Sequence, residues 1–232
     1  MTVQWLFDVD GVLCDTGSAI DSEFKDWFID WAKDKDIYLV TGSEREKTIC
    51  QIGQEIVDMA TMTFNCMGNS IWIQDREFRV NQFSLHADEL AWLESKIENS
   101  IYHTRTGNHI VCRPGSINFS ILGRNADTGQ RLDYRDWDKI NNERLSLIQE
   151  LKERFPRFDA FIGGDISIDI CLRGADKSQV YGLLLDRDIV YFFGDRCKPN
   201  EIDYPLVHKC QVQDSVFEVD GYKKTWEILK SL

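Results

Sequence analysis

The feature that most constrains the fold is an alternation of buried strands and helices within the first 60 residues. The run "QWLFDVD" is apolar enough for a buried strand, and "IYLVTGS" is a second one. The segments that follow them, "AIDSEFKDWFIDWAKDKD" and "EREKTICQIGQEIVDMA", have helical periodicity, with an aromatic stripe in the first that suits packing on a sheet. This order predicts a parallel, doubly wound α/β sheet.

Polar side chains follow both strands. Asp8 and Asp10 end the first strand before a turn at Gly11, and Thr41 and Ser43 end the second. Ligands of such sheets bind at the carboxyl ends of the strands, so these residues are expected to converge. Two carboxylates on one side of an extended strand raise one another's pKa unless a positive group lies between them. A metal, a phosphate or both would explain the pair.

The middle of the chain has a different pattern. From about residue 76, strand-like runs such as "FRVNQFSL", "HIVCRPGSINFSILGR" and "FDAFIGGDISIDICLRG" enclose two helical segments, "ADELAWLESKIENS" and "WDKINNERLSLIQELKERF". After Gly174 a helical segment, "DKSQVYGLLLDRD", and a buried strand, "IVYFFGDR", return. We therefore expect a core domain of residues 1–75 and 174–232, interrupted by an inserted α+β cap domain of residues 76–173.

Two strands of this cap have a polar face. Isoleucines alternate with Ser167 and Asp169 in one strand, and apolar residues alternate with Asn118 in the other. Such a face can simply be solvated. Arginines suit bidentate capture of phosphate, and three of them flank the second strand: Arg113, Arg124 and Arg131.

The strand "IVYFFGDR" also ends in an acid, Asp195, with Asp203 eight residues later. Upstream, Lys177 opens a helix, where a lysine and the helix N-terminus both favour an anion. One carboxylate at a strand end can be a helix cap. Four elements in the order Asp-x-Asp, Thr or Ser, Lys, and Gly-Asp favour a catalytic site.

Composition excludes several classes of protein. A net charge of -12 and a pI near 4.8 argue against nucleic-acid binding. No apolar run reaches the length of a membrane-spanning helix, and the start "MTVQWLFDVDG" lacks the features of a signal peptide. Seven cysteines without a CxxC pair are typical of the reduced thiols of a cytoplasmic protein.

The four elements resemble the motifs of the haloacid dehalogenase superfamily of phosphotransferases: "DVDG", "VTGS", the lysine of "GADKS", and "FFGDR". Nearly the whole chain is similar to the eukaryotic-type phosphomannomutases. That similarity is strongest in "CRPGSINFSILGR" with the downstream Arg131, in "GGDISIDICLRGADK" and in "YFFGDRCKP". The resemblance implies a Rossmann-like haloacid dehalogenase core with a cap inserted between the second and third motifs.

The resemblance also implies roles for the core residues. Asp8 would be the nucleophile that forms an aspartyl-phosphate, and Asp10 the general acid and base. Mg²⁺ would be held by Asp8, the backbone carbonyl of Asp10 and Asp195. Thr41 or Ser43 would hydrogen-bond the transferring phosphate, and Lys177 would neutralise it.

The implied substrate is a hexose phosphate, with a mannose phosphate favoured and a hexose bisphosphate as activator. In the cap, three arginines would bind the second phosphate of the sugar: Arg113, Arg124 and Arg131. Three polar residues would read its hydroxyls: Asn118, Ser167 and Asp169. A homodimer formed through the cap is a further expectation.

The implied reaction is the interconversion of mannose 6-phosphate and mannose 1-phosphate. A sugar-phosphate phosphatase is the alternative, because Gly17 stands where family members carry an arginine that contacts substrate, and Val12 replaces a threonine. A non-catalytic sugar-phosphate-binding protein is a third hypothesis. The presence of both Asp8 and Asp10 weighs against it.

Overall fold

The computed structural model describes residues 2–184 and 189–232, and the chain divides into two compact units. The first unit comprises residues 1–81 and 175–232, and the second comprises residues 82–174. The second unit starts later than residue 76, the start expected for the cap. The reason is that β5 (Arg76–Val80) pairs with β4 (Ser70–Ile73) in the sheet of the first unit.

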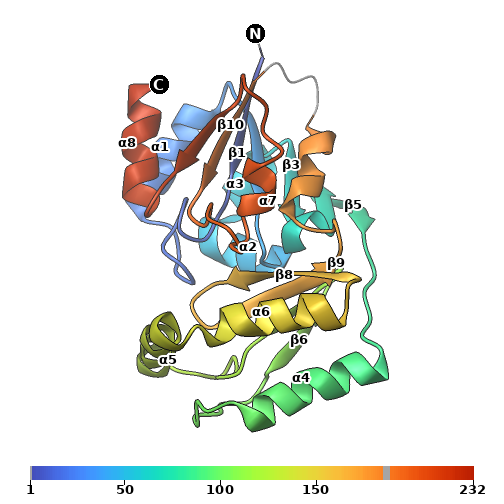
Figure 1. The fold of residues 1–232 in the computed structure, drawn as a ribbon. Helices are drawn as coiled ribbons and strands as arrows, with labels where there is room; N and C mark the ends of the chain where they lie inside the picture. Colours follow the sequence, from blue (N-terminus) through green and yellow to red (C-terminus); the bar gives the residue numbers. More distant parts are fainter. Residues whose placement is uncertain (1, 185–188) are drawn as a thin grey trace. The chain divides into compact units, whose positions relative to one another are not determined.

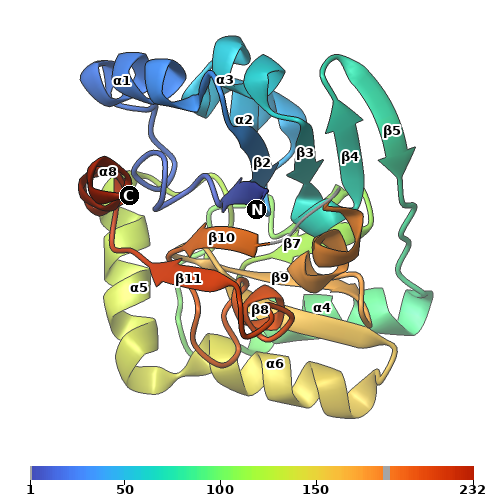
Figure 2. The ribbon, with the colours of Figure 1, turned by 90° about the horizontal axis from the view of Figure 1, so that it is seen from above.

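The first unit is built on a seven-stranded sheet with the order β11-β10-β1-β2-β3-β4-β5 (Figure 1). The first five strands in this order run parallel, which confirms the predicted α/β class, and β4 and β5 form an antiparallel edge (Figure 2). The remaining strands are β1 (Val3–Phe7), β2 (Asp36–Val40), β3 (Met62–Asn65), β10 (Ile189–Gly194) and β11 (Ser215–Glu218).

Helices cover both faces of this sheet. One face packs against α1 (Ser22–Ala32), α2 (Arg45–Ile52), α3 (Gln54–Met59) and α8 (Tyr222–Ser231). The other face packs against η2 (Lys177–Leu183) and α7 (Tyr204–Val207), and the short η1 (Cys66–Gly68) follows β3. In the aromatic stripe of α1, Phe24 and Phe28 are buried against the sheet, as the periodicity predicts.

Two expected helices of the first unit differ from the prediction. The segment 44–60 is two helices instead of one, because Gly53 between them has a φ of 86° that no α-helix accommodates. The segment expected to form a helix after Asp176 is the short 3-10 helix η2. Residues 185–188 of that expected helix lie outside the described residues.

The second unit is an antiparallel four-stranded sheet covered by helices, with the strand order β6-β7-β9-β8. Its strands are β6 (Ile110–Arg113), β7 (Ser116–Phe119), β8 (Phe158–Gly163) and β9 (Ser167–Leu172). Its helices are α4 (Ala87–Asn99), α5 (Thr128–Asn141) and α6 (Glu143–Arg154). Instead of one long helix, α5 and α6 are separated by Asn142, which adopts a left-handed φ of 53°.

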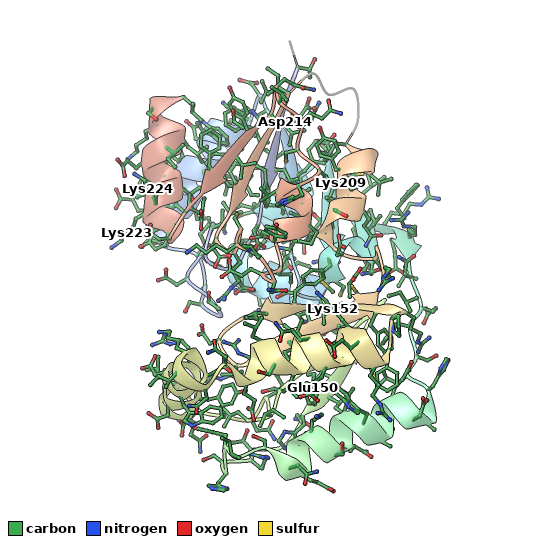
Figure 3. All side chains as sticks on the ribbon, viewed as in Figure 1. Glu150, Lys152, Lys209, Asp214, Lys223 and Lys224 are labelled. Atoms are coloured by element: carbon green, nitrogen blue, oxygen red, sulfur yellow. The ribbon has the colours of Figure 1, made fainter. Side chains whose placement is uncertain are left out.

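Asp214, labelled in Figure 3, links η2 to strand β10 in the first unit. Its carboxylate accepts hydrogen bonds from the hydroxyl of Tyr181 in η2 (2.6 Å) and from the backbone N–H of Val190 in β10 (2.8 Å). These bonds anchor η2 beside the sheet and so help to hold Lys177 at its first position.

Within residues 2–184 and 189–232, every helix is too short or too polar to cross a lipid bilayer.

Candidate active site

The candidate site of the first unit is built at the carboxyl ends of its parallel strands. Asp8 directly follows β1, Thr41 directly follows β2, and Asp195 directly follows β10. Gly11 makes the turn after Asp10 with a φ of 79°, and a Cβ at this position would lie 2.3 Å from Oδ2 of Asp195. Glycine is therefore required both by the turn and by the close approach of the third strand end.

A buried lysine joins two of the carboxylates. Nζ of Lys177 lies 2.8 Å from Oδ2 of Asp8 and 2.6 Å from Oδ1 of Asp203. The second oxygen of Asp8 accepts a hydrogen bond from the backbone of Val9 (2.7 Å), and Asp203 accepts one from the backbone of Arg196 (3.2 Å). Lys177 and Asp203 are fully buried, so this arrangement is rigid and shielded from solvent.

These carboxylates are crowded. Burial raises the pKa of Asp8 well above its usual value, and the charges of Asp203 and Asp195 raise it further against the opposing effect of Lys177. Burial and then Asp203 raise the pKa of Asp195 to about 7. Burial opposes the charge of Lys177, but Asp203 and Asp8 outweigh it and raise the pKa of the lysine. Arg196, whose Nε lies 3.6 Å from Oδ2 of Asp195, adds a second positive charge, but three carboxylates still outnumber these two cations.

The acidic cluster fits a hard divalent cation. One carboxylate oxygen from each of Asp8, Asp195 and Asp203 lies within 4.8 Å of the others. Carboxylate oxygens are the ligands that Mg²⁺ prefers, and a cation would offset the excess negative charge. Asp203 was visible in the sequence, but no role was expected for it. Its position eight residues after Asp195 was the available signal.

The side chain of Asp10 points to different partners from that of Asp8. Its Oδ1 accepts hydrogen bonds from the backbone of Gly17 (2.8 Å) and from Nε2 of Gln51 (2.7 Å). Its Oδ2 accepts from Nζ of Lys47 (2.9 Å) and from Oγ of Ser43 (3.2 Å). Burial raises the pKa of Asp10, but Lys47, Gln51 and the Gly17 N–H outweigh burial and lower it.

The expectation that Asp8 and Asp10 lie on the same side of an extended strand is therefore wrong. Strand β1 ends at Phe7, before either residue, and the chain turns between them. The like charges that act most strongly on Asp8 come from Asp203 and Asp195, whereas the pKa of Asp10 is lowered. Asp8 and Asp10 are close in sequence, but their carboxylates lie in two different environments.

Lys47 and Gln51 were not expected from the sequence to belong to this site. They lie four residues apart on α2, so they share one face of that helix. Their spacing directly after the second strand end was the only signal for them, and it is also typical of an ordinary solvated helix face.

The structure brings both expected hydroxyls to this region. Ser43 bonds directly to Asp10 and also accepts a hydrogen bond from Lys47 (2.9 Å). The Oγ1 of Thr41 accepts a hydrogen bond from the backbone N–H of Ser43 (3.1 Å). Both side chains are buried, and that of Ser43 is the one that contacts the carboxylate of Asp10.

A pocket of about 660 Å³ opens beside Asp195 within the first unit. Gly11 and Asp195 line it, together with five charged residues: Asp15, Lys198, Glu218, Asp220 and Lys224. Lys224, labelled in Figure 3, belongs to α8. Solvent and small ions therefore reach one edge of the acidic cluster from the first unit alone.

The second unit brings together four of its expected residues. Nδ2 of Asn118 donates to Oγ of Ser167 (3.0 Å) and to Oδ1 of Asp169 (2.7 Å), and Nη1 of Arg113 lies 3.4 Å from the same Asp169 oxygen. A Cβ at Gly163 would lie 2.0 Å from Oδ2 of Asp169, so glycine makes room for this carboxylate. The polar strand face is a connected network, not a row of isolated solvated groups.

Of the two remaining arginines, Arg124 lies in the loop before α5, and Arg131 lies in the first turns of that helix. Arg131 donates to the backbone oxygens of Ala126 (2.9 Å) and Arg124 (2.7 Å). Arg131 therefore braces the loop that carries Arg124. These bonds use part of the guanidinium that was expected to bind phosphate.

Comparison with known proteins identifies the family. A model of eukaryotic phosphomannomutase matches residues 24–231. A phosphomannomutase of Arabidopsis thaliana is 28% identical over 210 residues, which cover 87% of this chain and 85% of the relative. A phosphomannomutase of Babesia bovis is 29% identical over 244 residues and covers 98% of this chain and 96% of the relative.

Solved structures agree on the fold. A haloacid dehalogenase-like hydrolase from Bacteroides thetaiotaomicron superposes with a TM-score of 0.60 at 13% identity, covering 100% of this chain and 99% of that one. An IMP-nucleotidase from Plasmodium falciparum superposes with a TM-score of 0.65 at 14% identity, covering 99% and 68%. The matched family model and these structural neighbours lead to one conclusion: the chain belongs to the eukaryotic phosphomannomutase family and has a haloacid dehalogenase-like fold.

Proposed function

We propose that this protein is a phosphomannomutase-like phosphotransferase that interconverts mannose 6-phosphate and mannose 1-phosphate through an aspartyl-phosphate on Asp8. The observation that carries the proposal is the Asp8–Lys177–Asp203 cluster at the strand ends of a chain that belongs to this family.

In the proposed first step, a carboxylate oxygen of Asp8 attacks the phosphorus of a hexose bisphosphate. The new bond joins this oxygen to phosphorus, the bond from phosphorus to the sugar oxygen breaks, and protonated Asp10 gives its proton to the leaving oxygen. Lys177, 2.8 Å from Asp8, lies where it would stabilise negative charge on the phosphoryl group.

In the second step the phosphoryl group moves to the other hydroxyl of a hexose monophosphate. Asp10 accepts the proton of that hydroxyl, the sugar oxygen bonds to phosphorus, and Asp8 leaves as a carboxylate. Ser43 or Thr41 would hydrogen-bond the transferring phosphate. The bisphosphate must then turn, so that its second phosphate faces Asp8.

The second unit would hold the phosphate that is not being transferred, as the cap of this enzyme. Arg113 and Arg124 would bind its oxygens, and Arg131 would brace the loop that carries Arg124 while contributing its remaining N–H groups. The network of Asn118, Ser167 and Asp169 would recognise the sugar hydroxyls.

Asp8 and Asp195, with the backbone carbonyl of Asp10, would hold Mg²⁺, and Asp203 borders this site. When bound, Mg²⁺ supplies positive charge beside the transferring phosphoryl group. The raised pKa of Asp195, about 7, supports a site that requires such charge.

A phosphatase acting on sugar phosphates is the second candidate. Gly17 favours it, because a glycine leaves the substrate without the side-chain contact expected at this position, and nothing lies within 4 Å of a Cβ built there. Water would then take the phosphoryl group from Asp8 in place of a sugar hydroxyl.

One incubation separates the candidates. The protein is given mannose 1-phosphate, Mg²⁺ and a catalytic amount of hexose 1,6-bisphosphate, and mannose 6-phosphate and free phosphate are both followed. We expect mannose 6-phosphate to exceed free phosphate. Release of phosphate without mannose 6-phosphate would replace the mutase proposal with the phosphatase.

Location and assembly are further proposals. Seven free cysteines support a reducing compartment such as the cytoplasm. A homodimer through the second unit remains a prediction, and sedimentation of the purified chain would test it.

A further inference from the structure

One buried side chain, that of Asn69, bonds to both points at which the chain passes between the two units. The chain leaves the first unit after Asn81 and returns to it at Ala175. Nδ2 of Asn69 donates to the backbone oxygen of Ala175 (2.8 Å), and Oδ1 of Asn69 accepts from Nδ2 of Asn81 (2.9 Å). The backbone oxygen of Asn69 also accepts from the backbone N–H of Asn81 (2.7 Å). Asn69 therefore fastens both connections to the first unit.

Asn69 is itself held in one orientation. Its side chain is fully buried, and its amide donates a second hydrogen bond to the backbone oxygen of Cys66 (2.8 Å). Both hydrogens and the oxygen of the amide are thus bonded. Turning the amide would leave buried polar groups unsatisfied, which is costly. Asn69 is therefore a rigid anchor.

The backbone that leads to Asn69 is strained. Three consecutive residues of η1 have a left-handed backbone: φ is 49° at Cys66, 61° at Met67 and 87° at Gly68. Residues other than glycine adopt this conformation rarely, and it persists only where the surrounding structure holds it. A Cβ at Gly68 would lie 2.7 Å from Cγ1 of Val180, so η1 packs closely against η2. The strained segment is thus fixed from outside.

The groups that hold η1 belong to the candidate active site. The backbone N–H of Met67 donates to the oxygen of Thr41 (2.8 Å), and that of Cys66 donates to the oxygen of Ser43 (3.0 Å). On the other side, Nε2 of Gln179 donates to the oxygen of Met67 (2.9 Å). Gln179 lies in η2, the helix that begins with the buried lysine of the site. The anchor of both connections is therefore built onto the supports of the site itself.

We propose that Asn69 is a positioning residue that fixes both connections to the first unit and so limits the positions that the second unit can take when a hexose phosphate is bound. Asn69 acts through the two connections and not by touching substrate. If either connection is released, the second unit gains freedom that substrate binding must then remove, and this weakens binding. The inference rests on the proposed function, because it assumes that the second unit holds one phosphate of the substrate.

The test uses Asn69→Ala, which removes the three side-chain bonds and leaves the backbone bond to Asn81. Hydrogen exchange followed by mass spectrometry should be about tenfold faster in the peptides that contain Asn81 and Ala175. The kcat/KM for hexose phosphates should fall about tenfold, mainly through a higher KM. Hydrolysis of p-nitrophenyl phosphate should be largely unchanged, because it requires only the first unit.

A matched control is Asn65→Ala. Asn65 is also fully buried, and its amide donates to Oγ1 of Thr48 (2.9 Å) and to the backbone oxygen of Ser43 (3.3 Å). This variant should lower the free energy of unfolding as Asn69→Ala does, but it should leave exchange around Asn81 and Ala175 unchanged.

A second variant releases one connection only. Asn81→Ala removes the bond to Oδ1 of Asn69 from a half-buried residue. Exchange should become faster around Asn81 and stay unchanged around Ala175, and the loss on hexose phosphates should be smaller than in Asn69→Ala. If Asn69→Ala does not fold, this variant replaces it in the test.

Unchanged exchange around both connections in Asn69→Ala, or around Asn81 in the variant that replaces it, would overturn the role of Asn69. Equal losses on hexose phosphates and p-nitrophenyl phosphate would also overturn it, because Asn69 would then support the first unit alone. If the unmodified protein hydrolyses hexose phosphates without isomerising them, the mutase proposal falls, and the same measurements still decide the role of Asn69. If it acts on no hexose phosphate, both the proposed function and this inference fall.

Discussion

The acidic cluster of the first unit and the polar face of the second unit hold their charges in opposite ways. In the first, three carboxylates lie within 4.8 Å of one another, and Lys177 bonds to Asp8 and Asp203. In the second, Asp169 faces Arg113 at 3.4 Å and accepts a hydrogen bond from Asn118 at 2.7 Å. The first cluster has excess negative charge, and the second is nearly balanced.

The difference indicates what each region can bind. Burial, and then the neighbouring carboxylates, raise the pKa of both Asp8 and Asp195, so a cation that joins the first cluster should stabilise it. The second region gains little from a cation, since its carboxylate is already paired. Its amide, hydroxyl and guanidinium groups suit hydroxyls and phosphate oxygens instead.

The largest expected effect is on the nucleophile. Asp8→Asn should reduce phosphoryl transfer below detection, because the amide has nearly the same shape but is a poor nucleophile. The rate of hexose phosphate conversion and of p-nitrophenyl phosphate hydrolysis measures this. Asp169→Asn, the matched change in the second unit, should leave p-nitrophenyl phosphate hydrolysis largely intact. Appreciable turnover by the folded Asp8→Asn variant would contradict the aspartyl-phosphate mechanism.

The second effect concerns the cation. EDTA should abolish the activity and Mg²⁺ should restore it, because Lys177 and Arg196 do not fully balance the three carboxylates of Asp8, Asp195 and Asp203. Mg²⁺ at a hundredfold excess over its dissociation constant should add about 2.7 kcal/mol to the free energy of unfolding. The Asp195→Asn variant should lose most of this Mg²⁺-dependent gain in stability, as measured by thermal melts. Full activity in chelator would mean that the acidic cluster is structural.

The third effect is selective for the substrate. Arg124→Ala should weaken use of hexose phosphates about ten- to hundredfold, the cost of one hydrogen bond to a charged group. Hydrolysis of p-nitrophenyl phosphate should survive, because it requires only the first unit. Arg154→Ala, an exposed arginine at the end of α6, is the control. Equal losses on both substrates would show that the second unit does not recognise a second phosphate.

The smallest effect tests a fully paired carboxylate. Glu89 of α4 accepts two bonds from Arg157, and Nε of Arg157 lies 2.6 Å from Oε1. Burial raises the pKa of Glu89, but Arg157 and the His86 backbone outweigh burial and lower it below 4.5. The stabilisation is therefore present above the unfolded-state pKa and is lost as the pH falls through the folded-state pKa.

Glu89→Gln should accordingly lower the free energy of unfolding by about 1 kcal/mol at pH 7, since Arg157 stays partly solvated. The difference from the unmodified protein should shrink as the pH falls below about 4. Urea titrations at several pH values measure it. A difference that is independent of pH would show that the pair acts through packing alone.

Much of the core site could be predicted because it depends on local sequence. A buried parallel strand places the next polar residue at one edge of the sheet, so Asp8, Thr41 and Asp195 could be brought together from their strands alone. Gly11 was recognisable for the same reason, as the turn after an acidic strand end. Period-two alternation likewise put Ser167 and Asp169 on one polar face.

Helix breaks and edge strands were harder to predict. The helical patterns of 44–60 and 137–155 continue across Gly53 and Asn142, but the left-handed backbone at each splits the helix. The alternation in β5 resembles that of the strands of the second unit, and hydrogen bonding to β4 assigns it to the first. Periodicity reports which face of an element is apolar, but it does not report which sheet the element joins.

The amino-acid sequence was sufficient to determine the α/β class, the family and the strand ends that carry the carboxylates, because short-range periodicity and motif spacing encode them. Only the tertiary structure separated Asp8 from Asp10. It paired Asp8 with Lys177 and enclosed Asp10 between Lys47, Gln51, Ser43 and Gly17. The physical reason is that the pKa of a carboxylate and its hydrogen-bond partners depend on neighbours that are distant in sequence. Packing of α2 and η2 against the sheet brings those neighbours within hydrogen-bond distance.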